Sequence, residues 1–225
     1  MVEYGLVTPN TQAPARRKRM SRAERESQML DVAEEVFAEQ GYRATSMEEI
    51  AERCGVSKPM LYEYFGSKDG LLLACLARAR AELHRVTSEA MSGGDDPLDV
   101  LSRGLVAYYS FTSEHSRSFA LLMHEPMALP DATIEAVEGV RRQQHDLIAP
   151  VLAAWAPHLE PLQVEAYTEI IIGACERISL WCARRTDVTP EQATRYTLDF
   201  CWGGLSGTLR PEGDPPGLDQ RAGPE

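Results

Sequence analysis

The side chains best suited to chemistry in this sequence lie between residues 45 and 68. Lysine, serine, threonine and tyrosine in this stretch are donors of the kind that bind phosphates and base edges of nucleic acids. Thr45, Ser46 and Lys68 stand where helices are expected to begin, and free N–H groups, hydroxyls and positive charge at a helix N-terminus suit a phosphate. The outward face of the second expected helix carries Lys58, Met60, Tyr62 and Tyr64. This combination predicts contact with DNA.

Histidine, cysteine and glycine do not fall into the spacings typical of catalysis or metal binding. The histidines show no H-x-x-x-H pattern and the cysteines no C-x-x-C pattern. Gly203, Gly204 and Gly207 resemble a glycine-rich phosphate loop, but no strand is expected before them and no Gly-Lys follows. No G-x-S-x-G nucleophile motif is present. The sequence therefore does not indicate an enzyme, a metal site or a cofactor.

Two short helices joined by a tight turn are expected to position the donors. Ser46 and Glu49 have the spacing of a capping box, so the first of these helices should begin at Met47. Gly55 can adopt the left-handed conformation that ends it. Ser57 can then cap a second helix. This is the geometry of a helix-turn-helix, in which the second helix lies in the DNA major groove, and the alternative is an ordinary helical hairpin in a bundle.

The remaining sequence also predicts helices, so we expect an all-α fold. Further helices are expected over residues 21–41, 67–91, 97–123, 132–155, 162–185 and 190–209, with a kink or break in the fourth at Pro150. A loop is expected at residues 124–131. The expected organisation is a flexible basic arm (1–20), a three-helix helix-turn-helix DNA-binding domain (21–66), a helical ligand-binding and dimerisation domain (67–210) and a disordered tail (211–225).

The stretch GVSKPMLYEYFGSKDGLL, preceded by TSMEEIAERC, resembles the DNA-binding domain of TetR-family transcriptional regulators. The resemblance covers about residues 22 to 75. It implies a homodimer that binds a palindromic operator in double-stranded DNA and represses transcription until a small-molecule effector binds the C-terminal domain. It also implies base-edge contacts near the start of the second helix and phosphate contacts from its tyrosines. The expected DNA-binding residues are Thr45, Ser46, Ser57, Lys58, Pro59, Met60, Tyr62, Tyr64 and Lys68.

Aromatic and methionine side chains are concentrated in the C-terminal region, beyond what a support for DNA-binding helices needs. Most of them are expected in the core and some in a ligand pocket. Arg177 interrupts an apolar helix face, and the resemblance places His145 near it. Either residue can orient a polar group of a ligand or be satisfied by a carboxylate of the fold. The candidate ligand-binding residues are Tyr108, Phe111, Phe119, Met123, His145, Trp155, Arg177 and Trp181.

The last two expected helices are the candidate dimer interface. The segment IIIGAC (170–175) is apolar on nearly every side of its helix, and Gly173 and Gly204 permit close approach of a partner. An interface of this kind is large and hydrophobic, as in obligate dimers.

Charge and composition are compatible with a cytoplasmic DNA-binding protein. The formal net charge is −11, but residues 1–68 carry 10 Lys and Arg against 11 Asp and Glu, so the acidity lies mainly in the C-terminal region. Four basic residues (16–19) precede the first helix and either reach the minor groove or form a solvated charge run. No apolar run is long enough to span a membrane, and five scattered cysteines indicate a reducing compartment. The alternative function is a helical ligand-binding or interaction protein that keeps this scaffold without binding DNA. Sequence-selective binding to a short palindrome would distinguish a DNA-binding regulator from this alternative.

Overall fold

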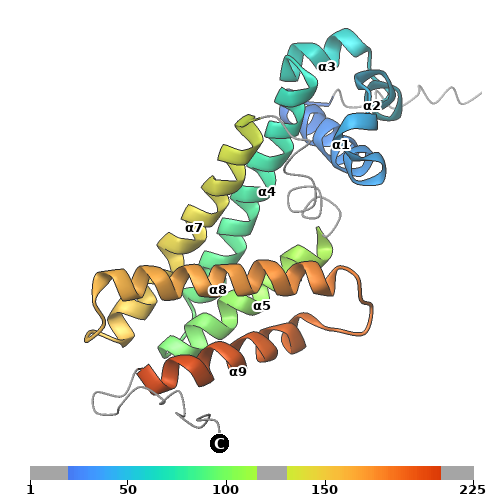
Figure 1. Ribbon diagram of the computed structural model, residues 1–225. Helices are drawn as coiled ribbons and strands as arrows, with labels where there is room; N and C mark the ends of the chain where they lie inside the picture. Colours follow the sequence, from blue (N-terminus) through green and yellow to red (C-terminus); the bar gives the residue numbers. More distant parts are fainter. Residues whose placement is uncertain (1–19, 116–130, 209–225) are drawn as a thin grey trace, which may run out of the picture.

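The computed structural model describes residues 20–115 and 131–208, which form helices and connecting turns with no strand (Figure 1). The basic arm and the C-terminal tail expected from the sequence lie outside these ranges, as do Phe119 and Met123. The helices are α1 (Arg22–Ala44), α2 (Met47–Cys54), α3 (Lys58–Phe65), α4 (Lys68–Met91), α5 (Pro97–Glu114), α7 (Asp131–Trp155), α8 (Pro161–Cys182) and α9 (Pro190–Thr208). The expected all-α fold is confirmed.

Local signals in the sequence set the ends of the first four helices. Ser21 and Glu24 form a reciprocal capping box at α1, and the hydroxyl groups of Ser46, Ser57 and Ser67 each accept a hydrogen bond from a backbone N–H in the first turn of α2, α3 and α4. Gly55 ends α2 with φ 67°, a left-handed conformation that is strained for residues with a Cβ. The turn between α2 and α3 therefore has the expected geometry.

Two boundaries in the C-terminal region differ from the prediction. Helix α5 ends at Glu114, before the expected end near Met123, and the backbone of its C-cap His115 is no longer helical. Helix α7 continues past Pro150 to Trp155, so of the expected kink or break, the break is wrong. Pro150 lies on the exposed face of α7. The carbonyl that loses its helical hydrogen bond there can be hydrated, which lowers the cost of keeping the proline inside the helix.

The core consists of two clusters that are connected by α4. The first cluster is built by α1, α2 and α3 around Phe37, Ile50 and Leu61, and the N-terminal half of α4 adds Leu71 and Leu72 to it. The second cluster is built by α5, α7, α8 and α9, and the C-terminal half of α4 adds Leu83. Figure 1 shows α4 descending from the three-helix domain into the larger domain, where α7 runs beside it. One continuous helix therefore belongs to both domains.

None of the helices within the described ranges combines the length and the apolarity that crossing a membrane requires.

Candidate DNA interface and ligand cavity

Helix α3 is held inward by one residue and leaves its opposite face open. Leu61 is fully buried in the first core cluster, whereas Met60 is 39% exposed and Tyr62 is 41% exposed. The Ser57 hydroxyl accepts a hydrogen bond from the Met60 backbone N–H at 3.3 Å. Pro59 lies beside Met60 in the same exposed first turn. The helix therefore presents several of the expected DNA-binding residues on one accessible surface.

Lys58, at the first position of α3, forms an ion pair with Glu48 of α2. The hydrogen bond with Glu48 raises the pKa of Lys58 above its ordinary value, and the same bond lowers the pKa of Glu48. The Lys58 ammonium also lies 5.9 Å from the centre of the Tyr62 ring. Lys58 is thus charged and exposed. When it contacts DNA, its ammonium must either leave the Glu48 carboxylate or bind Glu48 and DNA at the same time.

Tyr64 occupies the next position toward the end of α3 and is half-buried. Its ring packs on Phe65 at 6.0 Å between ring centres, and the Arg22 guanidinium of α1 lies 5.0 Å from its centre. Arg22 is not among the DNA contacts expected from the sequence. The structure brings this second positive group to the edge of the recognition helix.

Thr45 lies inside the fold, in contrast to Ser46. The Thr45 side chain is buried, and its hydroxyl lies 2.8 Å from the Gly41 carbonyl oxygen and 3.4 Å from that of Val36. The half-buried Ser46 hydroxyl accepts from the Glu49 backbone N–H at 3.2 Å and keeps its own proton for another acceptor. Ser46 can therefore donate to a phosphate, while the Thr45 hydroxyl caps the C-terminal end of α1.

Lys68 ties the start of α4 to the end of α1. Its ammonium donates to the carbonyl oxygens of Tyr42 at 2.9 Å and Thr45 at 3.1 Å, and it lies 4.3 Å from the centre of the Tyr42 ring. The Tyr42 hydroxyl donates to Asp69. Burial, followed by this hydrogen bond, raises the pKa of Tyr42 to about 12. Lys68 therefore has a structural role in addition to the phosphate contact expected from its position.

Substituting alanine for Lys68 is expected to lower the free energy of unfolding by about 1–3 kcal/mol, since two carbonyl groups lose a charged donor. Urea unfolding followed by circular dichroism measures this change. Lys58→Ala is the control, because its exposed ion pair with Glu48 should contribute about 0–1 kcal/mol. Equal stability of the two variants would contradict the structural role of Lys68.

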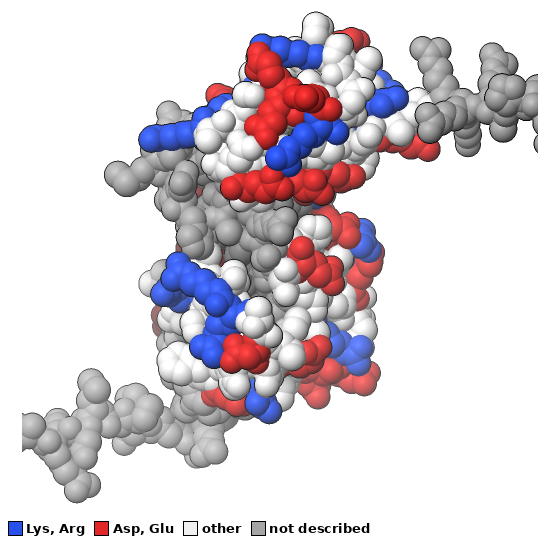
Figure 2. Space-filling model, turned by 90° about the vertical axis from the view of Figure 1, so that its right-hand side faces the viewer, with Lys and Arg blue, Asp and Glu red and all other residues white. Residues whose placement is uncertain are grey.

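On the face of the DNA-binding domain that Figure 2 shows, charges of both signs alternate. Arg53 of α2 pairs with Glu39 of α1 at 2.8 Å and with Glu49 at 3.2 Å. On this face, positive charge is therefore available to phosphates only from individual residues and not from a continuous basic patch.

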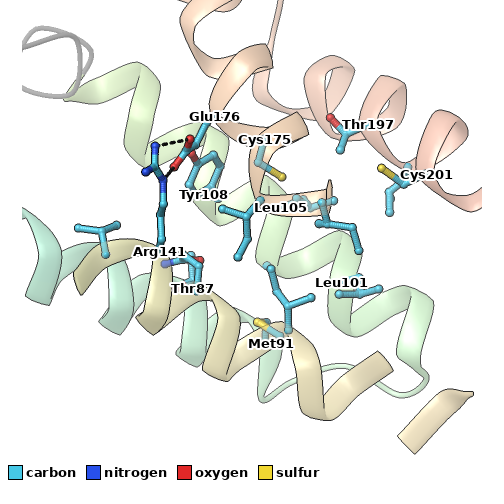
Figure 3. Close-up of a pocket in the computed structure, with 17 residues that line it drawn as sticks. Thr87, Met91, Leu101, Leu105, Tyr108, Arg141, Cys175, Glu176, Thr197 and Cys201 are labelled. Carbon is cyan, nitrogen blue, oxygen red and sulfur yellow. Dashed lines mark hydrogen bonds and ion pairs between the residues drawn. The ribbon is translucent and has the colours of Figure 1, made fainter. Parts of the chain in front are cut away.

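A narrow cavity of about 60 Å³ lies inside the C-terminal domain (Figure 3). It is enclosed by α4, α5, α7, α8 and α9, and it is lined by Thr87, Met91, Leu101, Gly104, Leu105, Tyr108, Val140, Arg141, Gln144, Ile148, Ile171, Ile172, Cys175, Glu176, Thr197, Leu198 and Cys201. The lining is mostly apolar and includes a few polar and charged side chains. The volume accommodates a few water molecules and is far below the roughly 300–1,000 Å³ of pockets that hold drug-sized ligands. A larger ligand must therefore displace side chains.

Of the expected ligand-binding residues within the described ranges, Tyr108 is the one that lines this cavity. Phe111 is buried on the same helix, but it packs on His115 with 4.4 Å between ring centres. His145 belongs to a shallow groove on the surface of α7 and α8 that also includes Pro150. Trp155 is half-buried and does not line the cavity.

Arg177 and Trp181 lie on the outer face of α8, away from the cavity lining. Trp181 is stacked by Arg185, whose guanidinium carbon is 5.1 Å from its ring centre. The same face of α8 carries Ile170, and a Cβ added at Gly173 would meet no atom within 4 Å. These residues are therefore placed where a partner, rather than an enclosed ligand, could reach them.

Two charged residues of the cavity were not predicted as site residues. Arg141 of α7 and Glu176 of α8 form a bidentate pair, with 2.8 Å from Nε to Oε1 and 3.1 Å from Nη2 to Oε2. They are 35 residues apart, so local spacing gives no sign of the pair. Glu176 does share the buried face of Ile172, Cys175 and Ser179, and this helical periodicity could have identified it as an inward-facing carboxylate.

The thiols of Cys175 and Cys201 also face the cavity. Burial raises the pKa of Cys175 to about 12 and raises that of Cys201. Both thiols therefore stay protonated at neutral pH and act as small apolar lining groups.

Arg78 and Arg80, two residues apart on α4, connect this helix to α1 and to α7, respectively. Arg78 pairs with Asp31 and Glu34 of α1, each at 2.7 Å. Arg80 donates from Nε to Gln143 Oε1 of α7 at 2.8 Å, and its guanidinium occupies the space beside Gly139, where a Cβ would approach within 2.5 Å. The region around Arg78 and Arg80 therefore links the DNA-binding domain to a helix of the cavity.

A helix-turn-helix domain joined by one helix to a larger domain with an internal apolar cavity defines a class of bacterial transcriptional regulators, and comparison with known families gives the same result. Residues 29–75 match the family of bacterial regulatory proteins described as the tetR family, and residues 97–204 match the tetracyclin repressor-like C-terminal domain. The chain belongs to the TetR family of transcriptional regulators, as its sequence resemblance implied.

Individual relatives match most of the chain. The transcriptional activator FasR of Mycolicibacterium smegmatis is 31% identical over 196 residues, which cover 85% of this chain and 87% of FasR. The transcriptional repressor KstR2 of Rhodococcus jostii is 29% identical over 178 residues, covering 79% and 76% of the two chains. The crystal structure of a TetR-like regulator from Rhodococcus sp. RHA1 is 31% identical, has a TM-score of 0.72, and is matched over 84% of this chain and 100% of its own.

Proposed function

We propose that this regulator binds a palindromic operator as a homodimer in the bacterial cytoplasm and leaves it when a small, partly apolar molecule enters the C-terminal domain. The observation that carries the DNA-binding part is the exposed face of α3, held in place by the buried Leu61. Lys58 can donate to a guanine, and Met60 can pack on a thymine methyl group. Ser46 and the tyrosines of α3 supply phosphate contacts, which fix the position of the helix in the groove.

The proposed dimer interface is the apolar outer face of α8 and α9. Ile170 of α8 is 59% exposed and Phe200 of α9 is 79% exposed, and Leu162 and Tyr196 are exposed on the same two helices. These exposed apolar residues on two neighbouring helices favour a second copy of this chain as the partner, because a two-fold dimer buries the same surface on both protomers. Two recognition helices joined in this way would read two half-sites.

The proposed effector enters the cavity by displacing flexible side chains such as Met91, whose Cγ would lie 2.8 Å from a Cβ added at Gly104. The crystal structure of FadR from Bacillus subtilis, which has the same fold at 17% identity and a TM-score of 0.69, is a complex with stearoyl-CoA. This supports an acyl-containing molecule as one effector to test for the present chain. Release of DNA requires that the effector bind more tightly to a conformation in which the recognition helices no longer match successive grooves.

The sign of regulation depends on where the operator lies. FasR is described as an activator and KstR2 as a repressor, although both resemble this chain over most of its length. We propose repression, because a dimer bound across a promoter excludes the polymerase until the effector releases it.

Selection from a random DNA library tests the proposed function. We expect a two-fold symmetric site whose binding weakens as salt rises, because phosphate contacts release counterions. Lys58→Ala should relax the preference at one base pair of each half-site, with a loss of about 1–3 kcal/mol there. Recovery of no symmetric site, together with unchanged selectivity of the variant, would favour a helical ligand-binding protein that does not act on DNA.

A further inference from the structure

The cavity carries its charge at one end. Arg141 and Glu176 are the charged residues among those that line it, and Figure 3 shows their paired side chains at one side, with Met91, Leu101 and Cys201 placed toward the other. The Arg141 side chain is 35% exposed and that of Glu176 is 18% exposed. Arg141 also pairs with Glu138 on its own helix. The cavity is therefore amphipathic, with one guanidinium that is already bound to carboxylates.

The hydrogen bonds of this guanidinium suit a planar anion. Arginine binds a carboxylate with two parallel N–H donors, and Glu176 accepts from two nitrogens of Arg141. The buried Tyr108 lies at the same end of the cavity, next to the pair. The Glu176 side chain is more exposed than its buried lining neighbours Ile172 and Cys175, so it can turn toward water when another anion takes its place. A neutral ligand offers no such exchange and leaves the pair intact.

We propose that the effector is an amphipathic carboxylic acid whose carboxylate replaces Glu176 on Arg141 while its hydrocarbon chain occupies the apolar part of the cavity. This rests on the proposed function of the C-terminal domain as an effector-binding domain. Exchange costs little electrostatically, because one carboxylate leaves the guanidinium as another arrives. The apolar chain supplies the net driving force through burial, at roughly 0.8 kcal/mol for each methylene group.

The exchange also explains how the ligand acts on DNA binding. The Arg141–Glu176 pair joins α7 to α8, and the ligand breaks this connection. Helix α7 contacts α4 through Gln143 and Gly139, which both receive the Arg80 side chain. A shift of α7 relative to α8 is thereby passed to α4 and to the DNA-binding domain that α4 supports.

Decanoate and decan-1-ol form the test, because they share a chain and differ in charge. Titration calorimetry with the full-length protein measures both affinities. In Glu176→Gln the ligand meets no competing carboxylate, so this variant should bind decanoate more tightly than the wild type does and roughly ten- to hundredfold more tightly than decan-1-ol, which is the size of one charged hydrogen-bonded contact. Adding Arg141→Gln to this variant should remove the preference for decanoate. Arg142→Gln, at the exposed neighbouring position of α7, is the matched control and should keep the preference.

A purely structural role of Arg141 would weaken both ligands alike and leave their affinity ratio unchanged, which would overturn the proposal. Failure of wild-type protein to bind decanoate, or equal affinity of Glu176→Gln for the acid and the alcohol, would also overturn it. Decanoyl-CoA is a third ligand to titrate. If it binds more tightly than decanoate, and if Arg141→Gln does not change its affinity, then the ligand class is the thioester and the proposal of a free acid is overturned. Operator binding is measured separately without ligand, so its failure would contradict the proposed function and not the assignment of Arg141.

Discussion

Phe200→Asp is expected to convert the protein into a monomer and to lower its affinity for a two-half-site operator by about a hundredfold or more. Phe200 is 79% exposed on α9 of the isolated chain. Burying a phenylalanine in a dimer contributes about 1.5–3 kcal/mol, and a two-fold interface contains this contribution twice. Aspartate removes both contributions and places two carboxylates in an apolar contact, which adds a desolvation cost. Sedimentation velocity measures the association, and a gel-shift titration measures DNA binding.

Ile134→Asp provides the control for this prediction. Ile134 is also an exposed apolar residue, but it lies on α7 rather than on the proposed interface. The variant should remain dimeric with normal operator affinity. A dimer of unchanged strength for Phe200→Asp would show that the protomers associate through another surface.

Leu61→Ala is expected to remove about 2–5 kcal/mol from the free energy of unfolding of the DNA-binding domain and to abolish operator binding at physiological temperature. Leu61 is the fully buried residue of α3, so truncating it leaves a cavity between the recognition helix and α1, α2 and α4. Stability is measured by thermal unfolding, and DNA binding by fluorescence anisotropy.

The preceding residue supplies a matched comparison. Met60 lies on the exposed side of the same helix, so Met60→Ala should keep the stability within about 0.5 kcal/mol while changing the preferred bases of the operator. A stable Leu61→Ala variant with full operator affinity would contradict the anchoring role of Leu61. Loss of stability in Met60→Ala would instead indicate that the exposed face of α3 contributes to the fold.

The DNA-binding domain could be predicted almost completely from the sequence, because its determinants are local. Serine caps stand next to the helices that they begin, and Gly55 stands at the turn that needs its left-handed backbone. The side-chain partners were less predictable. The ties of Lys68 to the backbone of Tyr42 and Thr45 bring together residues that are more than 20 positions apart, and no spacing rule indicates them.

The ligand cavity was harder to predict for a similar reason. Its residues come from five helices, and an apolar side chain on a helix can face either the cavity, the core or a partner. Tyr108 was among the aromatic candidates of the C-terminal region and does line the cavity, whereas Trp181 and Arg177 lie on the opposite surface of α8. The segment 170–175 of α8 is apolar on nearly every side, and this pattern does not say which face encloses a ligand.

The sharing of α4 between the two core clusters has a consequence for protein engineering. A chimaera that exchanges the DNA-binding domain of this regulator for that of a relative would be joined most simply at residue 66, where the recognition helix ends. That junction would separate Leu61 and Phe37 from Leu71 and Leu72, which pack in the same cluster, and it would leave Arg78 opposite a foreign α1. A junction after Arg78 would carry the whole N-terminal cluster with its ion pairs and would keep Arg80 with α7. The interchangeable unit of this protein therefore ends inside a helix, one residue before Ala79 begins the packing of the second core.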